Sequence, residues 1–134
     1  MRIAINGEHS EGFVNALNEK LNGVVVKTRL NEINFDYPKF PVVGYAMKCY
    51  EFKDDEKNII FDGSLLDGYL NSKGVAGFYN LQENILIDTF ATMDKVIIIT
   101  KGYSDEKLAE VEFLKDCFPD KIVLGETEED IIIG

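Results

Sequence analysis

Short runs of aliphatic residues alternate along this chain with segments of helical spacing, and this alternation constrains the fold more than any other feature. The expected strands are rich in Ile and Val and cover residues 1–6, 24–26, 58–62, 95–100 and 120–124. Strands that alternate with helices are joined by right-handed crossovers, which place them parallel in a sheet with both faces covered. We therefore predict one α/β domain over residues 1–134, with three layers: a mainly parallel sheet and helices on both of its faces.

Apolar residues three and four positions apart mark the helices between these strands. The first helix is indicated by Phe13, Val14, Leu17 and Leu21, with Gly23 as its expected stop. Two further apolar series predict helices before the fourth and fifth strands: Leu81, Ile85, Leu86, Phe90 and Met93, and then Leu108, Val111, Leu114 and Phe118.

Two helix starts carry capping signals. Ser104 is a suitable N-cap, and Asp105 and Glu106 after it suit the positive end of a helix dipole. The sequence from Thr127 to Asp130 resembles a capping box, which leaves a last helix and a last short strand as alternatives.

The charge balance limits the classes of partner. The chain holds 14 Lys and Arg against 24 Asp and Glu, a net charge of −10 at pH 7. Sequence-independent nucleic-acid binding and docking on anionic lipid both need a basic surface, so we expect neither. No apolar run reaches the roughly 18 residues of a membrane span, and the N-terminus lacks a signal-peptide pattern. These features favour a cytoplasmic location.

Cysteine and histidine are too few for common metal sites. Cys49 and Cys117 form neither a CxxC pair nor a zinc spacing, so we expect two reduced, buried thiols. His9 is the single histidine. It could act as a general base or metal ligand, but a lone loop histidine more often lies exposed and idle. We expect no metal and no cofactor.

The turn after the first strand has the spacing of a phosphate-binding loop. It reads Gly7-Glu8-His9-Ser10-Glu11-Gly12 and is followed by Phe13-Val14. Its two glycines are separated as in the P-loop pattern G-x-x-x-x-G-K-[ST], and they follow a strand and precede a helix, as that pattern requires. The lysine and the hydroxyl residue of the pattern are replaced by Phe13 and Val14.

Residues 1–22 resemble the opening of P-loop nucleoside and nucleotide kinases of the thymidylate-kinase-like type. Two more segments agree with this family. Residues 58–67, with Asp62, Ser64 and Asp67, resemble its strand ending in D-R-S-x-x-D, and residues 96–100 match its next core strand. The resemblance implies a P-loop-kinase-like fold, a phosphate loop at Gly7–Gly12, and Mg²⁺ binding by Asp62 in an active member.

The departures from this family all fall on functional positions. The resemblance implies a lysine for the β- and γ-phosphates, a hydroxyl for Mg²⁺ and an arginine for the substrate phosphate. Phe13, Val14 and Gly63 stand in their places. Glu8 and Glu11 add negative charge to a loop that would hold phosphate. Phosphoryl transfer depends on positioning and electrostatics, so these losses predict an inactive, vestigial phosphate loop. The alternative is that Gly7 and Gly12 are ordinary turn and helix-start glycines of an unrelated α/β domain.

Two other groups are candidate binding residues. Asp62, Ser64 and Asp67 could line a ligand cleft, with the two carboxylates as an acid–base pair or a Mg²⁺ site; otherwise Asp62 is a relic and Asp67 a helix-surface residue. Four aromatic residues flank the prolines of an irregular segment and suit a protein interface or a base-stacking pocket, with packing onto the body as the alternative: Phe35, Tyr37, Phe40 and Tyr45.

An acidic stretch near the end of the chain has two interpretations. Glu126, Glu128, Glu129 and Asp130 are typical of a solvated face, or they could mimic a nucleic-acid backbone for a basic partner.

Together these features favour a catalytically inactive P-loop-kinase-like domain that binds a protein as a regulator or inhibitor. Its size and decayed motif favour an origin in a phage or mobile element. The alternative is a nucleoside- or nucleotide-binding protein, or a small nucleotide kinase with an atypical P-loop.

Overall fold

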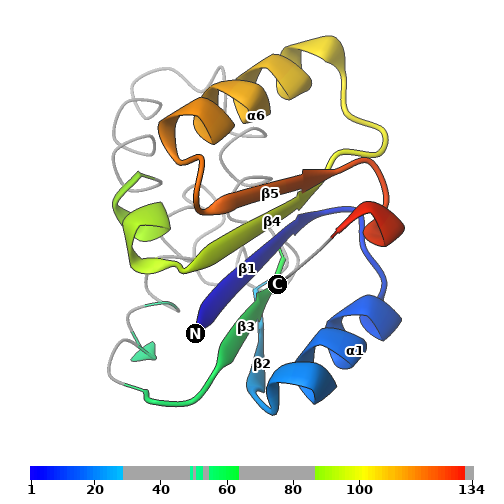
Figure 1. Cartoon of the computed structure of the whole chain (residues 1–134). Coiled ribbons are helices and arrows are strands. Elements are labelled where there is room, and N and C mark those ends of the chain that lie inside the picture. The colour runs from blue at the N-terminus through cyan, green and yellow to red at the C-terminus, as the bar shows by residue number, and fades with distance from the viewer. Residues whose placement is uncertain (29–48, 50, 53–54, 64–86, 132–134) are drawn as a thin grey trace.

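The computed structural model describes residues 1–28, 49, 51–52, 55–63 and 87–131. Within them five parallel strands form one sheet in the order β2-β3-β1-β4-β5 (Figure 1). The strands are β1 (Arg2–Gly7), β2 (Val24–Lys27), β3 (Ile59–Asp62), β4 (Lys95–Ile99) and β5 (Ile122–Gly125). The predicted parallel sheet is confirmed, and β1 lies between β3 and β4.

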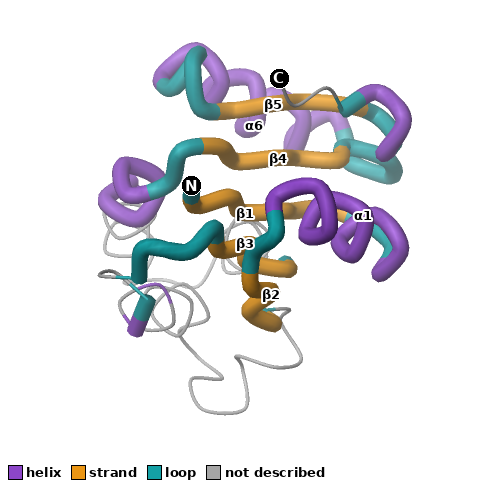
Figure 2. The backbone as a smooth tube through the Cα atoms, turned by 60° about the horizontal axis from the view of Figure 1, so that its bottom comes forward, coloured by secondary structure: helices purple, strands orange, loops and turns teal. Residues whose placement is uncertain are grey.

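Helices cover both faces of this sheet and complete the predicted three layers. Helix α1 (Glu11–Leu21) packs on one face, and α6 (Asp105–Cys117) packs on the other with a helical segment at residues 87–92. Figure 2 shows α1 and α6 on opposite sides of the sheet. A short 3₁₀ helix, η1 (Glu128–Asp130), follows β5. None of the described helices is long and apolar enough to cross a membrane.

Successive residues of β1 point to opposite faces of the sheet and enter two separate core clusters. Ile3 and Ile5 pack with Val14 and Leu17 of α1, whereas Ala4 packs on the other side. The cluster around Ala4 takes Phe90 from the 87–92 segment, Met93 from directly after it, and Val111 and Leu114 from α6. A strand covered on both faces needs apolar residues at every position, which is why the aliphatic runs are continuous rather than alternating.

Side-chain caps fix where the helices begin. Ser10 Oγ accepts a hydrogen bond from the backbone N–H of Phe13 at 3.2 Å, and Ser104 Oγ accepts one from Lys107 at 3.3 Å. These hydroxyls satisfy N–H groups that have no partner inside the helix. The Ser104 cap is thus confirmed.

The stop of α1 differs from the expected one. Asn22, not Gly23, adopts the left-handed conformation, with a φ of 51°. Gly23 is small for another reason: a Cβ at that position would lie 2.4 Å from the carbonyl oxygen of Asn58. Gly23 is thus required by the close approach of the chain at Asn58 and not by the conformation of the turn.

Arg2 organises the amino end of the sheet. Its guanidinium donates to the carbonyl oxygens of Phe52 and Cys49, each at 3.0 Å, and lies 5.4 Å from the centre of the Phe61 ring. Cys49 is buried beside it, whereas Cys117 is exposed at the end of α6. The expectation of two buried thiols is therefore wrong for Cys117, because that position faces away from the sheet.

We predict that the two thiols differ sharply in reactivity at pH 8. Burial raises the pKa of the Cys49 thiol to about 12, although the charge and hydrogen bond of Arg2 act to lower it. Because the thiolate is the reactive form, an aromatic disulfide reagent will modify one thiol of the native protein and both after denaturation. The Cys117→Ser variant will lose the native reaction; its persistence in that variant would contradict the assignment.

Candidate functional site

A pocket of about 460 Å³ lies at the carboxyl edge of the sheet. It is lined by residues from the turn after β1, the end of β4 and the turn after β5: Glu8, His9, Ser10, Ile99, Lys101, Thr127, Glu128 and Glu129. The chain leaves β1 toward α1 on one face and leaves β4 toward α6 on the other. Adjacent strands whose connections diverge in this way open a crevice, the usual ligand position in such folds.

The two glycines of the phosphate-loop pattern have different roles. Gly7 has a φ of 84°, and a Cβ there would lie 2.0 Å from the carbonyl oxygen of Ile99. Gly7 therefore lets the turn begin tight against β4. Gly12 lies inside α1, which already begins at Glu11, and the atom nearest to an added Cβ is 3.8 Å away. The turn thus covers only residues 8–10, three residues fewer than the Gly7–Gly12 pattern predicts.

His9 is held between the turn and β3. Its Nε2 lies 2.5 Å from Asp62 Oδ1, and its Nδ1 lies 2.8 Å from the carbonyl oxygen of Gly7. The side chains of His9 and Asp62 are only 2% and 7% exposed. The expectation of an exposed histidine is wrong, because the carboxylate at the end of β3 and the bend of the chain enclose the ring.

The partners of His9 determine where its protons lie. The Gly7 carbonyl oxygen can only accept, so Nδ1 carries a proton. Nε2 and the Asp62 oxygen need a second proton between them, because otherwise two lone pairs would face each other. Both ring nitrogens thus have hydrogen-bond partners, and His9 links the turn after β1 to the end of β3.

Glu128 approaches the start of α1 from the other end of the sequence. Its Oε1 accepts from the backbone N–H of Ser10 at 2.5 Å, and its Oε2 accepts from Ser10 Oγ at 3.2 Å. The start of a helix attracts anions, because its N–H groups and dipole present positive charge there. In this chain the anion is the protein's own carboxylate.

Phe13 and Val14 are directed away from the pocket. Val14 is buried in the core cluster on the α1 face, and Phe13 is partly buried against the same cluster. The two positions that carry phosphate and Mg²⁺ contacts in a P-loop thus belong to the packing of α1 on the sheet.

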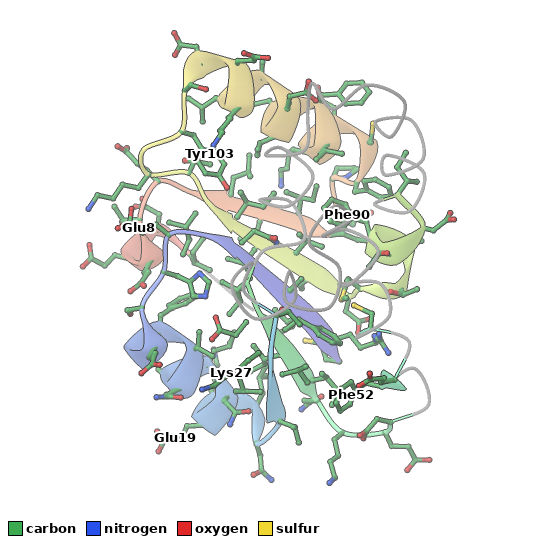
Figure 3. The ribbon with its side chains drawn as sticks, turned by 180° about the vertical axis from the view of Figure 1, so that it is seen from behind. Glu8, Glu19, Lys27, Phe52, Phe90 and Tyr103 are labelled. Atoms are coloured by element: carbon green, nitrogen blue, oxygen red, sulfur yellow. The ribbon has the colours of Figure 1, made fainter. Side chains whose placement is uncertain are left out.

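Carboxylates outnumber cations around the pocket. Glu8, Glu128 and Glu129 line it, and Lys101 is the one lysine or arginine among the described lining residues. Figure 3 labels Glu8 at the turn that follows β1. In the part of the chain that the structure describes, no group of three or more His, Cys, Asp or Glu side chains is placed to hold a metal ion.

The structure covers only part of the residues singled out by sequence. Asp62 is buried against His9 and does not line the pocket. Ser64 and Asp67 lie outside the described residues, as do all four aromatic residues of the candidate interface: Phe35, Tyr37, Phe40 and Tyr45.

In the acidic stretch, Asp130 accepts from the N–H of Thr127 at 3.0 Å, in keeping with the expected capping box. Sequence reasoning missed the role of Glu128. The capping box places this residue at a tight turn, but no local signal connects it to a serine 118 positions earlier.

Comparison with protein-family models, with curated protein sequences and with solved structures returned no match.

The two glycines give a matched test of the turn geometry. We expect Gly7→Ala to lower the free energy of unfolding by about 3 kcal/mol, because its Cβ would collide with Ile99. Gly12→Ala should leave stability unchanged or raise it by about 0.5 kcal/mol, since alanine favours a helix and space is available there. Urea unfolding followed by circular dichroism measures both. Equal losses would contradict the placement of Gly12 within α1.

A second prediction concerns the His9–Asp62 pair. Asp62→Ala should lower the free energy of unfolding by about 2 kcal/mol, because it removes the partner of a buried N–H, and Asp62→Asn should cost less. His9 is the only histidine, so its imidazole signals in ¹H–¹⁵N spectra are unambiguous. We expect a proton on Nδ1 in the wild type, and loss of the strongly deshielded shared proton in Asp62→Asn. A ring protonated only on Nε2 would contradict this geometry.

Proposed function

We propose that this chain is a non-catalytic P-loop-kinase-like domain that acts by binding another protein. The observation that carries the proposal is the position of Glu128, whose carboxylate is held on the N–H and hydroxyl of Ser10. That is the helix start where a phosphate loop would hold its phosphate. A carboxylate built into the fold takes the place of the ligand.

The packing of the next two residues supports the same conclusion. A kinase needs a cation and a hydroxyl directly after the second glycine, aimed back at the phosphates. Phe13 and Val14 instead pack toward the core on the α1 face. Restoring a serine at Val14 would place a hydroxyl in a buried position, which costs stability.

The charge of the pocket also disfavours the binding of a nucleoside triphosphate at the carboxyl edge of the sheet. Three carboxylates line the pocket, and Lys101 is the single lysine or arginine among its described lining residues. Two like charges about 4 Å apart repel by about 1 to 4 kcal/mol under surface-like screening.

A second candidate function is the binding of an uncharged nucleoside or a related small molecule. It is favoured by the pocket itself, because about 460 Å³ at a diverging pair of strands is within the usual range of ligand sites. Such a ligand would not require the missing phosphate contacts.

Thermal unfolding with added ligands tests both proposals. We expect no rise in Tm with millimolar ATP and Mg²⁺, because Phe13 and Val14 supply neither the lysine nor the hydroxyl of a P-loop. The Glu128→Ala variant should behave in the same way, since it uncovers Ser10 but leaves Phe13 and Val14 in the core. Glu129→Ala is the matched control, because it removes the neighbouring exposed carboxylate of the same turn.

The outcomes separate the candidates. A ligand that binds the native state raises Tm. A rise with nucleosides but not with ATP would favour the second function, whereas Mg²⁺-dependent ATP binding at micromolar affinity would overturn the non-catalytic proposal.

A further inference from the structure

Helix α6 presents an aromatic ring on the side opposite its packed face. Val111 and Leu114 are buried against the sheet, whereas Phe113 is 60% exposed. Residues turn by about 100° each along an α-helix, so Phe113 lies about 200° around the axis from Val111. Ala109 and Cys117, one turn before and one turn after it, are exposed as well. They form a short apolar ridge along the outer face of α6.

Acidic side chains surround this ridge. Exposed carboxylates share the outer side of the helix with the ring: Asp105, Glu106, Glu112 and Asp116. The two lysines of α6 are directed elsewhere. Lys115 Nζ donates to the carbonyl oxygen of Ile122 at 2.6 Å, and Lys107 Nζ lies 5.6 Å from the centre of the Tyr103 ring. Tyr103 itself lies on the sheet side of α6 (Figure 3).

The ridge has no role in the described core. Phe113 belongs to neither core cluster, and it is more exposed than the two other large apolar side chains at the described surface, Met1 at 46% and Ile87 at 41%. In Figure 1 no described element lies over the outer side of α6. Aromatic residues at protein interfaces commonly act as anchors, and charges around them steer association.

We propose that the outer face of α6 is a docking surface for a basic protein. Phe113 enters an apolar pocket of that partner, and the surrounding carboxylates face its lysine and arginine side chains. This inference rests on the proposed protein-binding function and names the surface and the chemistry of the partner.

Charge complementarity selects this occupant over two others. A second copy of the chain, related by a two-fold axis, would bring the same carboxylates against one another. A nucleic acid would bring phosphates to an acidic face of a protein whose net charge is −10. A basic protein surface satisfies both the ring and the charges.

The test selects ligands from a displayed library of random linear peptides against the intact protein. We expect the enriched peptides to combine apolar residues with an excess of Lys and Arg. Phe113→Ser should weaken their binding by about thirtyfold, the loss typical of a central anchor. Ile87→Ser is the matched control, because it removes another exposed apolar side chain and should leave the affinity unchanged. Circular dichroism and Tm confirm that each variant is folded.

A charge test is independent of the ring. The Glu112→Lys/Asp116→Lys double variant should slow association and reduce its dependence on salt, because screening acts on the same attraction. Peptides without basic residues, or a loss equal in Ile87→Ser and Phe113→Ser, would overturn the proposed surface. So would sedimentation showing a dimer that Phe113→Ser dissociates, since the occupant would then be a second copy.

The failure of this inference is distinguishable from failure of the proposed function. If peptide binding is lost in a Tyr37→Ala/Phe40→Ala variant but retained in Phe113→Ser, the α6 surface is wrong and the protein-binding function stands. If ATP with Mg²⁺ binds at micromolar affinity, the proposed function fails whatever the peptides do.

Discussion

The position of β1 between β3 and β4 is the constraint on which the rest of the structure depends. Its backbone pairs with both neighbours, and its side chains enter both core clusters. A strand held in this way leaves no freedom in where its last residue points. Gly7 therefore begins the turn directly against Ile99, and the three residues after it reach the ends of β3 and the turn after β5. The pairing of β1 at the centre of the sheet therefore fixes where the residues of the pocket lie at its carboxyl edge.

The fold was accessible from the sequence because its signals are local. Continuous aliphatic runs mark strands that are buried on both faces, and Ser104 with the acidic residues after it marks a helix start. The contacts of the site are not local. Asp62 meets His9 across 53 positions, and Glu128 meets Ser10 across 118. Neither pair has a spacing pattern, since the strand order and the turns beyond the strands bring these residues together. The misjudged environments of His9 and Cys117 have the same origin: burial is a tertiary property.

Two features of the pocket edge reinforce one another. The Glu128 carboxylate accepts from the N–H of Ser10, a group that would otherwise attract an anion. The His9 ring is hydrogen-bonded to Gly7 and Asp62. Polar groups that bind one another in this way rigidify the edge of the pocket. The outer side of α6 has the opposite character, with a large apolar ring in water. The molecule thus combines a pocket edge whose polar groups bind one another with an outer helix face that exposes an aromatic ring.

The contact between Ser10 and Glu128 also has a consequence for how the protein is made. The N-terminal part of a chain leaves the ribosome first and can begin to fold before the rest is synthesised. Helix α1 can pack once β1, β3 and β4 have been translated, because its core partners lie in those strands, but its carboxylate partner is translated only after β5. Until then, the start of α1 lacks that partner. A nascent chain would therefore pass through a stage that the finished protein does not retain, in which the first helix has an open anion position.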